Sequence, residues 1–139
     1  MTVVFFTDRD LGSRFPEVLA DAELTVERHR DHFAPDCADE VWLRSIGERG
    51  WVALTHDRRI RYKPNELSAV IQHRVALLVI IGDASYPDLA RAFVATLPRI
   101  KRFLARNSPP FIGKVYRPSA AEFRRSPGAP GRVVLWYPR

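Results

Sequence analysis

Three aspartates lie at the ends of short apolar runs, where folding can bring their carboxylates together. Asp8 closes the run VVFFTD, Asp39 opens ADEVWLRSIGERG and Asp57 closes WVALTHD. A strand that ends in Asp presents its carboxylate at the rim of a sheet, and a helix that begins with Asp points its carboxylate at the same rim. Such groups repel one another unless a divalent cation holds them together. The spacing therefore predicts a metal-dependent catalytic centre.

The cation expected at this centre is Mg²⁺ or Mn²⁺, which carboxylates bind with several waters retained. Such an ion lowers the pKa of a bound water and shields the charge of an attacked phosphate. The rest of the chain offers no comparable chemistry, since it has neither a phosphate-binding glycine loop nor a Ser-His-Asp pattern on a nucleophile elbow. His29, His32 and Cys37 have side chains that zinc prefers, but their spacing fits no standard zinc pattern and a fourth ligand is missing.

Strand-like and helix-like segments alternate along the chain, which predicts an α/β fold. The expected strands are Val3–Thr7, Leu24–Arg28, Trp51–Thr55 and Val75–Ile81. The expected helices are Leu11–Ala22, Asp39–Arg49, Asn65–His73 and Tyr86–Arg106. Right-handed βαβ units then give a three-layer helix–sheet–helix sandwich with a mainly parallel central sheet. Functional sites in such sheets lie at the carboxyl ends of the strands, where Asp8 and Asp57 are expected.

Two local features bear on the helices. Asp36 or Asp39 is expected to cap the helix that starts at residue 39. Pro98 interrupts the apolar pattern of the Tyr86–Arg106 helix and is expected to kink it. Trp42 and Trp51 are interpreted as core anchors rather than base-stacking platforms.

The 139 residues suffice for one domain, expected to span residues 1–139. Residues 1–82 carry the motifs, residues 83–106 the long helix and residues 107–139 a basic, β-rich C-terminal extension. Two short β-like pieces in that extension, Ile112–Tyr116 and Arg132–Tyr137, are expected to form a hairpin or to lie on a sheet edge. No segment is apolar for long enough to cross a membrane, and a single cysteine fits a reducing compartment. The expected location is cytoplasmic.

Charge is divided unevenly between the two parts of the chain. Residues 1–57 hold twelve of the sixteen acidic residues and six of the 22 Lys and Arg residues, whereas the remainder is strongly basic. Such asymmetry predicts a nucleic-acid or other acidic partner. The alternative is an ordinary basic surface encoded by Arg-rich codons, because only three of the cations are Lys.

At these residues the sequence resembles the PIN-like nucleases, in particular the short PIN-like toxins of toxin–antitoxin pairs. The resemblance runs from Val3 to Gly82 and rests on FFTDRDLG, ADEVWLRSIGERG, GWVALTHDRRI and VALLVIIG. It implies that Asp8, Asp39 and Asp57 are the metal-binding and catalytic acids. It also implies Mg²⁺-dependent endonucleolytic cleavage of RNA and a cognate antitoxin as protein partner.

The chain departs from the full family pattern at the fourth acid, for which no position is an unambiguous match. Glu40 and Asp10 are the nearest spare carboxylates, and Asp36 and Asp83 are more distant. Because the fourth ligand is undecided, the number of metal ions stays open between one and two.

Residues beside the three acids have more than one reading each. Thr55 and His56 are expected to support the ligand carboxylates by hydrogen bonds, although His56 also suits a phosphate contact or an exposed turn. A basic group next to the acids is expected to hold RNA phosphates without reading sequence, or to be a solvated face. This group comprises Arg9, Arg58, Arg59, Arg61 and Lys63. The bland alternatives for the acids are turn residues at Asp8 and Asp57 and a helix cap at Asp39.

The sequence therefore predicts a Mg²⁺- or Mn²⁺-dependent endoribonuclease, the toxin component of a type II toxin–antitoxin system. The alternative is a catalytically silent nucleic-acid or protein-binding module on the same fold. A metal-dependent phosphatase or DNase would use the same centre. Assembly into a homo-oligomer stays open, and no membrane partner is expected.

Overall fold

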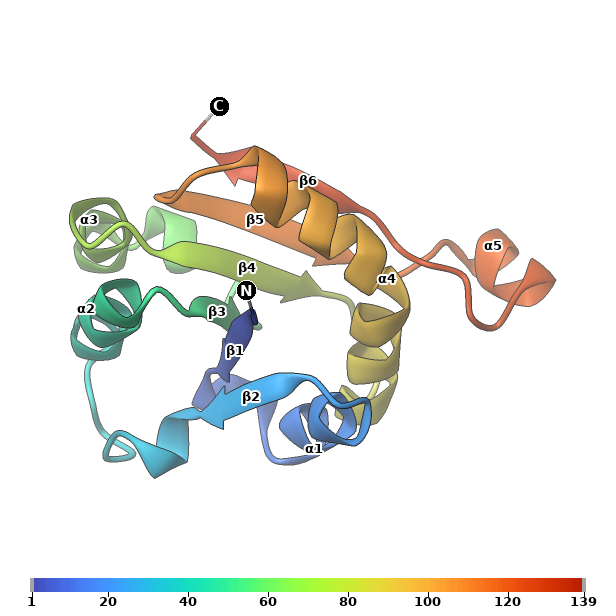
Figure 1. Ribbon diagram of the computed structural model, residues 1–139, viewed down its shortest axis with the longest axis horizontal. Helices are drawn as coiled ribbons and strands as arrows, with labels where there is room; N and C mark the ends of the chain where they lie inside the picture. Colours follow the sequence, from blue (N-terminus) through green and yellow to red (C-terminus); the bar gives the residue numbers. More distant parts are fainter. Residues whose placement is uncertain (1, 139) are drawn as a thin grey trace.

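A six-stranded sheet forms the centre of the computed structural model, which describes residues 2–138 (Figure 1). Its strands are β1 (Val4–Thr7), β2 (Thr25–Arg28), β3 (Val52–Thr55), β4 (Ala76–Ile81), β5 (Phe111–Tyr116) and β6 (Val133–Tyr137). They lie in the order β2-β1-β3-β4-β5-β6. Neighbours from β2 to β5 are parallel, and β6 is antiparallel to β5. The predicted α/β sandwich with a mainly parallel sheet is confirmed.

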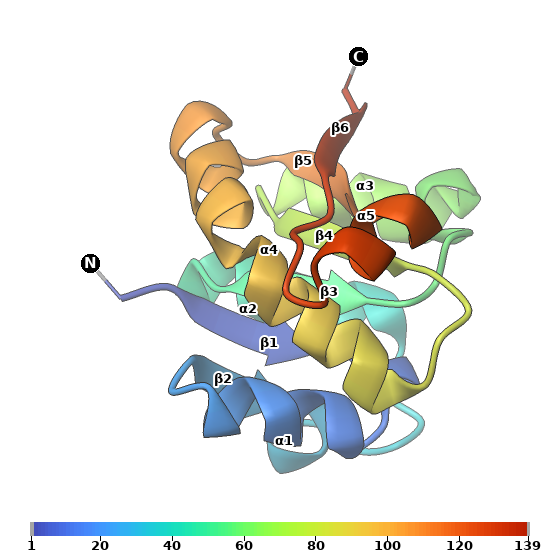
Figure 2. The same ribbon diagram turned by 90° about the vertical axis from the view of Figure 1, so that its right-hand side faces the viewer.

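Helices cover both faces of this sheet. They are α1 (Arg14–Asp21), α2 (Asp39–Arg49), α3 (Pro64–Gln72), α4 (Tyr86–Arg106) and the short α5 (Ala120–Arg125). Helices α1 and α4 pack on one face and α2 and α3 on the other (Figure 2). Three single-turn 3₁₀ helices complete the chain: η1 (Arg9–Leu11), η2 (His29–Asp31) and η3 (Ile60–Tyr62). Among the described helices, none is both long and apolar enough to span a bilayer.

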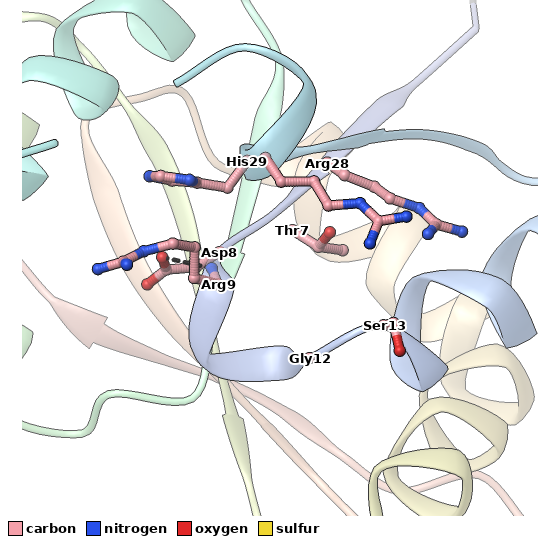
Figure 3. Close-up of a pocket in the computed structure, with 8 residues that line it drawn as sticks. Thr7, Asp8, Arg9, Gly12, Ser13, Arg28 and His29 are labelled. Atoms are coloured by element: carbon pink, nitrogen blue, oxygen red, sulfur yellow. Dashed lines mark hydrogen bonds between the residues drawn. The ribbon is translucent and has the colours of Figure 1, made fainter. Parts of the chain in front are cut away.

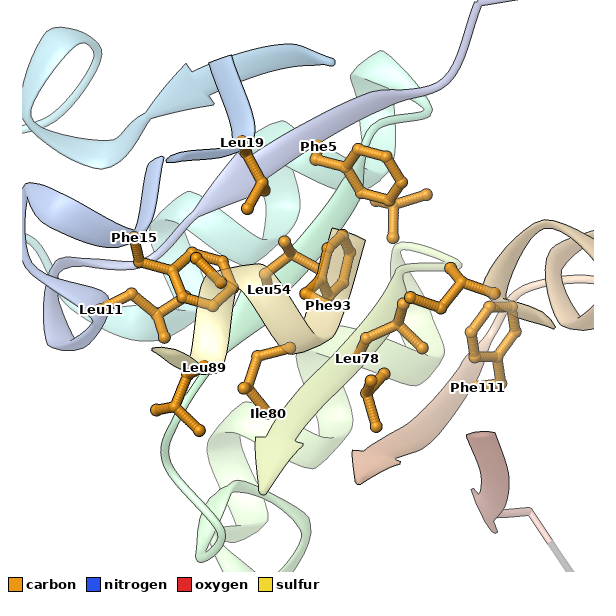
Figure 4. Packing of buried hydrophobic residues seen from close by; sticks show 14 residues of the cluster. Phe5, Leu11, Phe15, Leu19, Leu54, Leu78, Ile80, Leu89, Phe93 and Phe111 are labelled. Atoms are coloured by element: carbon orange, nitrogen blue, oxygen red, sulfur yellow. The ribbon is translucent and has the colours of Figure 1, made fainter. Parts of the chain in front are cut away.

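Alternating side chains of the strands build a separate core on each face. Phe5 points to the face of α1 and α4, where it meets the ring of Phe93 edge-on at 5.3 Å (Figure 4). The next residue, Phe6, points to the opposite face and packs 5.3 Å from the ring of Trp42 on α2. Trp51 is partly buried against the same cluster, so both tryptophans pack as anchors. This alternation follows from the two-residue period of a strand and fixes which strand ends carry functional side chains.

Two helix predictions are corrected by the structure. Helix α1 starts at Arg14 rather than at the predicted Leu11, because Leu11 ends η1 and Gly12 follows with a left-handed φ of 66°. Either Asp36 or Asp39 is predicted to cap α2, but the N-cap is Ala38, and no side chain caps this end. Asp39 is instead the first residue of the helix, and its carboxylate accepts a hydrogen bond from Trp42 Nε1 at 2.9 Å. Pro98 lies inside α4 and does not end it: the helix continues to Arg106.

The C-terminal residues complete the sheet. β5 pairs with β4 in parallel, and β6 lies on the far edge. The two β-like pieces predicted in this region therefore form an antiparallel pair, and one of them, β6, is the edge strand of the sheet. The segment between them projects from the body and carries α5, which the sequence analysis missed (Figure 1). Ser119 and Glu122 close a capping box at its start, a signal that was readable in the sequence.

Candidate active site

Four aspartates line an open pocket of about 530 Å³ at the carboxyl edge of the sheet. Asp8 follows β1 and Asp57 follows β3, and these two strands are parallel neighbours. Asp39 begins α2, the helix that leads into β3, so it reaches the same edge. Asp10, on η1, is the fourth. The fold thus brings all three acids expected from the sequence to one pocket, together with one of the two nearest spare carboxylates.

Asp8 and Asp10 converge on the hydroxyl group of Thr55. Thr55 Oγ1 lies 2.9 Å from Asp8 Oδ2 and 3.0 Å from Asp10 Oδ2. The backbone N–H of His56 donates to Asp10 at 3.1 Å. Because a hydroxyl carries one proton, Thr55 donates to only one of the two carboxylates at a time. Thr55 therefore supports both carboxylates but cannot satisfy both at once.

The electrostatics of this pair show unbalanced negative charge. Burial, followed by the charge of Asp10, raises the pKa of Asp8 from 3.8 to about 7; the charge of Asp39 adds to the effect, and the hydrogen bond from Thr55 opposes it. Burial also raises the pKa of Asp10. Across residues 2–138, neither carboxylate forms an ion pair with a Lys, Arg or His side chain. A cation in this part of the pocket would relieve the repulsion.

Asp57 has the opposite environment. Its Oδ2 lies 2.6 Å from Lys63 Nζ, and its Oδ1 accepts hydrogen bonds from the backbone N–H of Arg59 at 2.9 Å and from Arg59 Nε at 3.3 Å. Burial alone would raise the pKa of Asp57, but the hydrogen bonds from Lys63 and Arg59 outweigh it and lower that pKa. The negative charge of Asp57 is already balanced by protein cations.

The pocket does not hold the acids in a closed ligand sphere. Within the described part of the chain, no three Asp, Glu, His or Cys side chains are grouped closely enough to hold a metal ion. The carboxylates of Asp8, Asp10 and Asp39 nevertheless have the donor chemistry of a Mg²⁺ or Mn²⁺ site, and they influence one another electrostatically. The donor chemistry of these three groups suits a divalent cation, although their carboxylates would have to move closer together to share one. Asp57 would first have to give up its contacts with Lys63 and Arg59. That Asp8, Asp39 and Asp57 share an ion stays a prediction.

Glu40 takes no part in this pocket. It lines a different hollow between α2 and α3, together with Val41 and Arg44. The reason is helical geometry, since consecutive residues of a helix point about 100° apart. Of the two spare carboxylates considered most closely, only Asp10 lies beside the predicted acids.

The basic residues expected beside the acids separate into two groups. Arg9, Arg58 and Arg59 line the acidic pocket, and Arg58 also approaches Asp83 at 3.5 Å. Arg61 lies elsewhere: its guanidinium stacks within 5.4 Å of the Trp136 ring and 5.5 Å of the Tyr62 ring. It therefore belongs to an aromatic cluster beside β6 and does not line the acidic pocket.

His56 is held in place by the neighbouring strand. Its Nδ1 lies 2.7 Å from the carbonyl oxygen of Ile80 at the end of β4. Its ring also meets that of Tyr86 edge-on at 6.3 Å. These contacts fix the backbone of His56, whose N–H supports Asp10.

The sequence analysis missed a second cavity on the other side of Asp8, of about 120 Å³ (Figure 3). Its basic side chains are Arg9, Arg28, His29 and Arg30. The run RHR starts at Arg28, the last residue of β2, and the carboxyl end of β2 lies beside that of β1. The strand-end rule that singled out Asp8 and Asp57 could have found these residues too.

Comparison with known proteins gives one match. A family model described as a PIN-like domain matches residues 3–82, more than half of the chain. No curated protein matches the chain. No solved structure matches it either. The matched region contains all four aspartates of the acidic pocket.

Proposed function

The chain belongs to the PIN-like domain family, and on that premise we propose that it is a metal-dependent endoribonuclease. The observation that carries the proposal is the unbalanced charge at Asp8 and Asp10. Two half-buried carboxylates share one hydroxyl donor, and partial burial together with the charge of Asp10 raises the pKa of Asp8 to about 7. Groups with strongly perturbed pKa values in a pocket are typical of functional sites.

In the proposed site, Asp8, Asp10 and Asp39 hold Mg²⁺ or Mn²⁺. A bound ion of this kind activates a water and neutralises charge on a phosphodiester under attack. Thr55 and the backbone of His56 fix the Asp8 and Asp10 carboxylates from the strand side. Asp57 is the fourth acid and joins when Lys63 and Arg59 turn away from it.

The arginines on the pocket rim would place the substrate. Arg9, Arg58 and Arg59 line the same pocket as the acids, so they are positioned to contact phosphates on either side of the cleaved bond. Guanidinium groups bind phosphate oxygens in paired hydrogen bonds and carry no sequence information by themselves. RNA is the proposed substrate because of the family resemblance and the basic second part of the chain.

We further propose that the protein is the toxin of a type II toxin–antitoxin pair and acts in the cytoplasm. This rests on the resemblance of the motifs FFTDRDLG and GWVALTHDRRI to short PIN-like toxins, whereas the family match itself extends only to the PIN-like domain. A cognate antitoxin would inhibit the enzyme by covering the acidic rim or by inserting a cation into it. Detection of a small adjacent reading frame with a DNA-binding N-terminal region would support this part of the proposal.

A second candidate function is a catalytically silent binding module on the same fold. The observation that favours it is the engagement of Asp57 by Lys63 and Arg59, with no closed group of metal ligands among residues 2–138. In that case the protein would bind RNA or another protein, and divalent cations would have no effect on its stability or binding.

The deciding experiment is RNA cleavage with Mg²⁺ or Mn²⁺ and with EDTA. Wild type, Asp8→Asn and Asp57→Asn are compared with Asp36→Asn, a charge-matched control at an exposed residue. The proposal requires cleavage that EDTA stops, that the first two substitutions reduce strongly and that the control leaves unchanged. Cleavage at the wild-type rate by Asp57→Asn would exclude a role for that acid, and equal rates in Asp8→Asn would exclude the mechanism. DNA and a small phosphate ester, tested in parallel, separate ribonuclease from DNase and phosphatase activity.

A further inference from the structure

The second cavity, next to Asp8, is rich in unpaired positive charge. It lies between η1, the start of α1 and the residues that follow β2 (Figure 3). Arg9, Arg28 and Arg30 all line it, and none of them forms an ion pair within residues 2–138. Its only acidic lining residue is Asp8. Glu27 lies nearby in sequence, but it is engaged by His32 at 2.8 Å. Three guanidinium groups around one small cavity favour an anionic ligand.

The residues between η1 and α1 border the same cavity. Gly12 and Ser13 line it, and Ser13 is the N-cap residue of α1, yet its side chain makes no capping hydrogen bond. The N-terminus of an eight-residue helix therefore opens here without a side-chain cap. Backbone N–H groups at such an end attract negative charge. In Figure 3, the Arg28 side chain extends to the Ser13 side of the cavity.

His29 supplies an independent sign of a missing ligand. Its side chain is only 2% exposed, and neither ring nitrogen has a hydrogen-bond partner. The ring packs among Phe6, Phe33 and Trp42, and it lies on the Arg9 side of the cavity, above Asp8 (Figure 3). A buried imidazole without a partner costs free energy, because its polar atoms have left water and gained nothing. A ligand oxygen in the cavity would provide that partner.

We propose that this cavity binds a phosphate group of the RNA, held by Arg28 and Arg30 with Arg9, His29 and the start of α1. The inference rests on the proposed function, because it makes RNA the carrier of the phosphate. A cavity of about 120 Å³ has room for roughly four waters, and hence for one tetrahedral phosphate. Asp8 lines both this cavity and the acidic pocket. A phosphate bound in the cavity would therefore fix the position of the RNA relative to the four aspartates.

The phosphate has two possible sources within RNA. It can be a terminal monophosphate, which would make the enzyme select RNA ends, or an internal backbone phosphate near the cleaved bond. Both present anionic, non-bridging phosphate oxygens to the arginines, and the experiment distinguishes the two sources. Inorganic phosphate is the smallest probe for the cavity itself.

The test measures binding in EDTA by calorimetry, with short RNAs that carry a 5′-phosphate, a 3′-phosphate or neither. Arg28→Gln/Arg30→Gln is compared with Arg102→Gln/Arg106→Gln, which removes equal charge from exposed positions on the last turns of α4. We expect the cavity variant to lose about tenfold or more in affinity and the control to lose clearly less. A terminal-phosphate preference that the cavity variant abolishes identifies an end-binding site. Equal affinity of wild type for all three RNAs, with the same selective loss, identifies a backbone phosphate.

A second variant separates binding from folding. His29→Phe keeps an aromatic ring among Phe6, Phe33 and Trp42 but removes both unpartnered nitrogens. We expect an unchanged or higher unfolding temperature together with weaker binding of inorganic phosphate and RNA. Because binding is measured without divalent metal, it is independent of cleavage. If wild type shows no nuclease activity but the cavity variants still lose binding selectively, the proposed enzyme activity is refuted and the phosphate site is not. A cavity variant that binds like the control, or a wild type that binds neither RNA nor inorganic phosphate, would refute the phosphate site.

Discussion

The two sides of the acidic pocket contain the same kind of residue in opposite electrostatic states. On one side, Asp8 and Asp10 share the Thr55 hydroxyl, and burial raises the pKa of both. On the other side, Asp57 contacts Lys63 and Arg59, and its pKa is lowered. Among residues 2–138, no cationic side chain forms an ion pair with Asp8 or Asp10, whereas Asp57 forms ion pairs with two.

This difference teaches where a metal ion would bind first. A divalent ion gains most where it relieves repulsion between carboxylates, and less where it must displace an ammonium or guanidinium group. Asp8 and Asp10 should therefore dominate metal affinity. Asp57 should matter mainly once substrate phosphates compete for the side chains of Lys63 and Arg59.

The largest effect is expected from Asp8→Asn. RNA cleavage should fall on the order of 10³-fold, since the metal is worth several kcal/mol in the transition state and 1.36 kcal/mol is tenfold in rate. The same change should stabilise the metal-free protein at pH 8. The folded-state pKa is raised, so the stability present below pH 4 is lost as pH rises through about 7. Asn avoids that loss, which amounts to up to about 4 kcal/mol.

Thermal unfolding at pH 8, with and without Mg²⁺, checks both halves of this prediction. Wild type should gain stability from the ion, and Asp8→Asn should start higher and gain little. The exposed Asp36→Asn variant should behave like wild type in both conditions. If Asp8→Asn is less stable than wild type without metal, the charge of Asp8 does not destabilise the folded protein. The proposed electrostatic difference between Asp8 and Asp57 would then be wrong.

The next effect concerns the hydroxyl group that Asp8 and Asp10 share. Thr55→Val keeps the shape of this fully buried side chain but removes the donor, so Mn²⁺ affinity should fall about 10- to 100-fold. Thr96→Val is the matched control, because Thr96 is also fully buried and hydrogen-bonded, to Ala92 and Gly131 on the far side of α4. Both variants should lose stability, and only Thr55→Val should lose metal affinity. Equal metal affinities measured by calorimetry would show that the hydroxyl does not support the site.

Much of the fold was readable because strong periodic patterns fix buried faces. Helices α2 and α4 begin and end at the predicted residues, and the six described strands agree with prediction to within a residue at each end. Helix α5 was missed because none of its residues is buried, so no apolar face marks it in the sequence. Only the capping box formed by Ser119 and Glu122 signals its start.

The site was readable to the level of strand ends and no further. The rule that strand ends meet at one edge brings Asp8, Asp39 and Asp57 to one pocket. It does not say that Lys63 folds back through η3 to contact Asp57, because that contact depends on the path of a short loop. Nor does it distinguish Asp39 from Glu40. The side chains of these consecutive helix residues point about 100° apart, so Glu40 lines a different hollow.

A smaller effect is expected from pH on the wild-type protein. Because the pKa of Asp8 is raised to about 7, a divalent ion must displace a proton from this carboxyl below neutral pH. Mn²⁺ affinity should rise about tenfold from pH 6 to pH 8, with roughly half of that gain in free energy or more below pH 7, and level off above pH 8. Calorimetry in buffers of different ionisation enthalpy counts the released proton. In Asp57→Asn the same profile should persist, since the pKa of Asp57 is lowered and this group is already ionised. If the pH dependence disappears in Asp57→Asn, the displaced proton comes from Asp57 and not from Asp8, which would contradict this prediction.

The smallest effect is expected at Asp57, which is paired with Lys63 and Arg59. Lys63→Met removes the ammonium group 2.6 Å from Asp57 and keeps much of the side-chain volume. The pKa of Asp57 should rise, because burial then acts against the charge with only Arg59 to oppose it. Metal affinity should increase a few-fold as the freed carboxylate becomes available, at a stability loss of about 1 kcal/mol or less for this partly exposed pair. NMR titration of the Asp57 carboxyl and calorimetry with Mn²⁺ measure the two changes, with Lys101→Met on the exposed face of α4 as control. A fall in metal affinity would mean that Lys63 orients Asp57 for binding rather than competing with the ion, and the two sides of the pocket would then act as one unit.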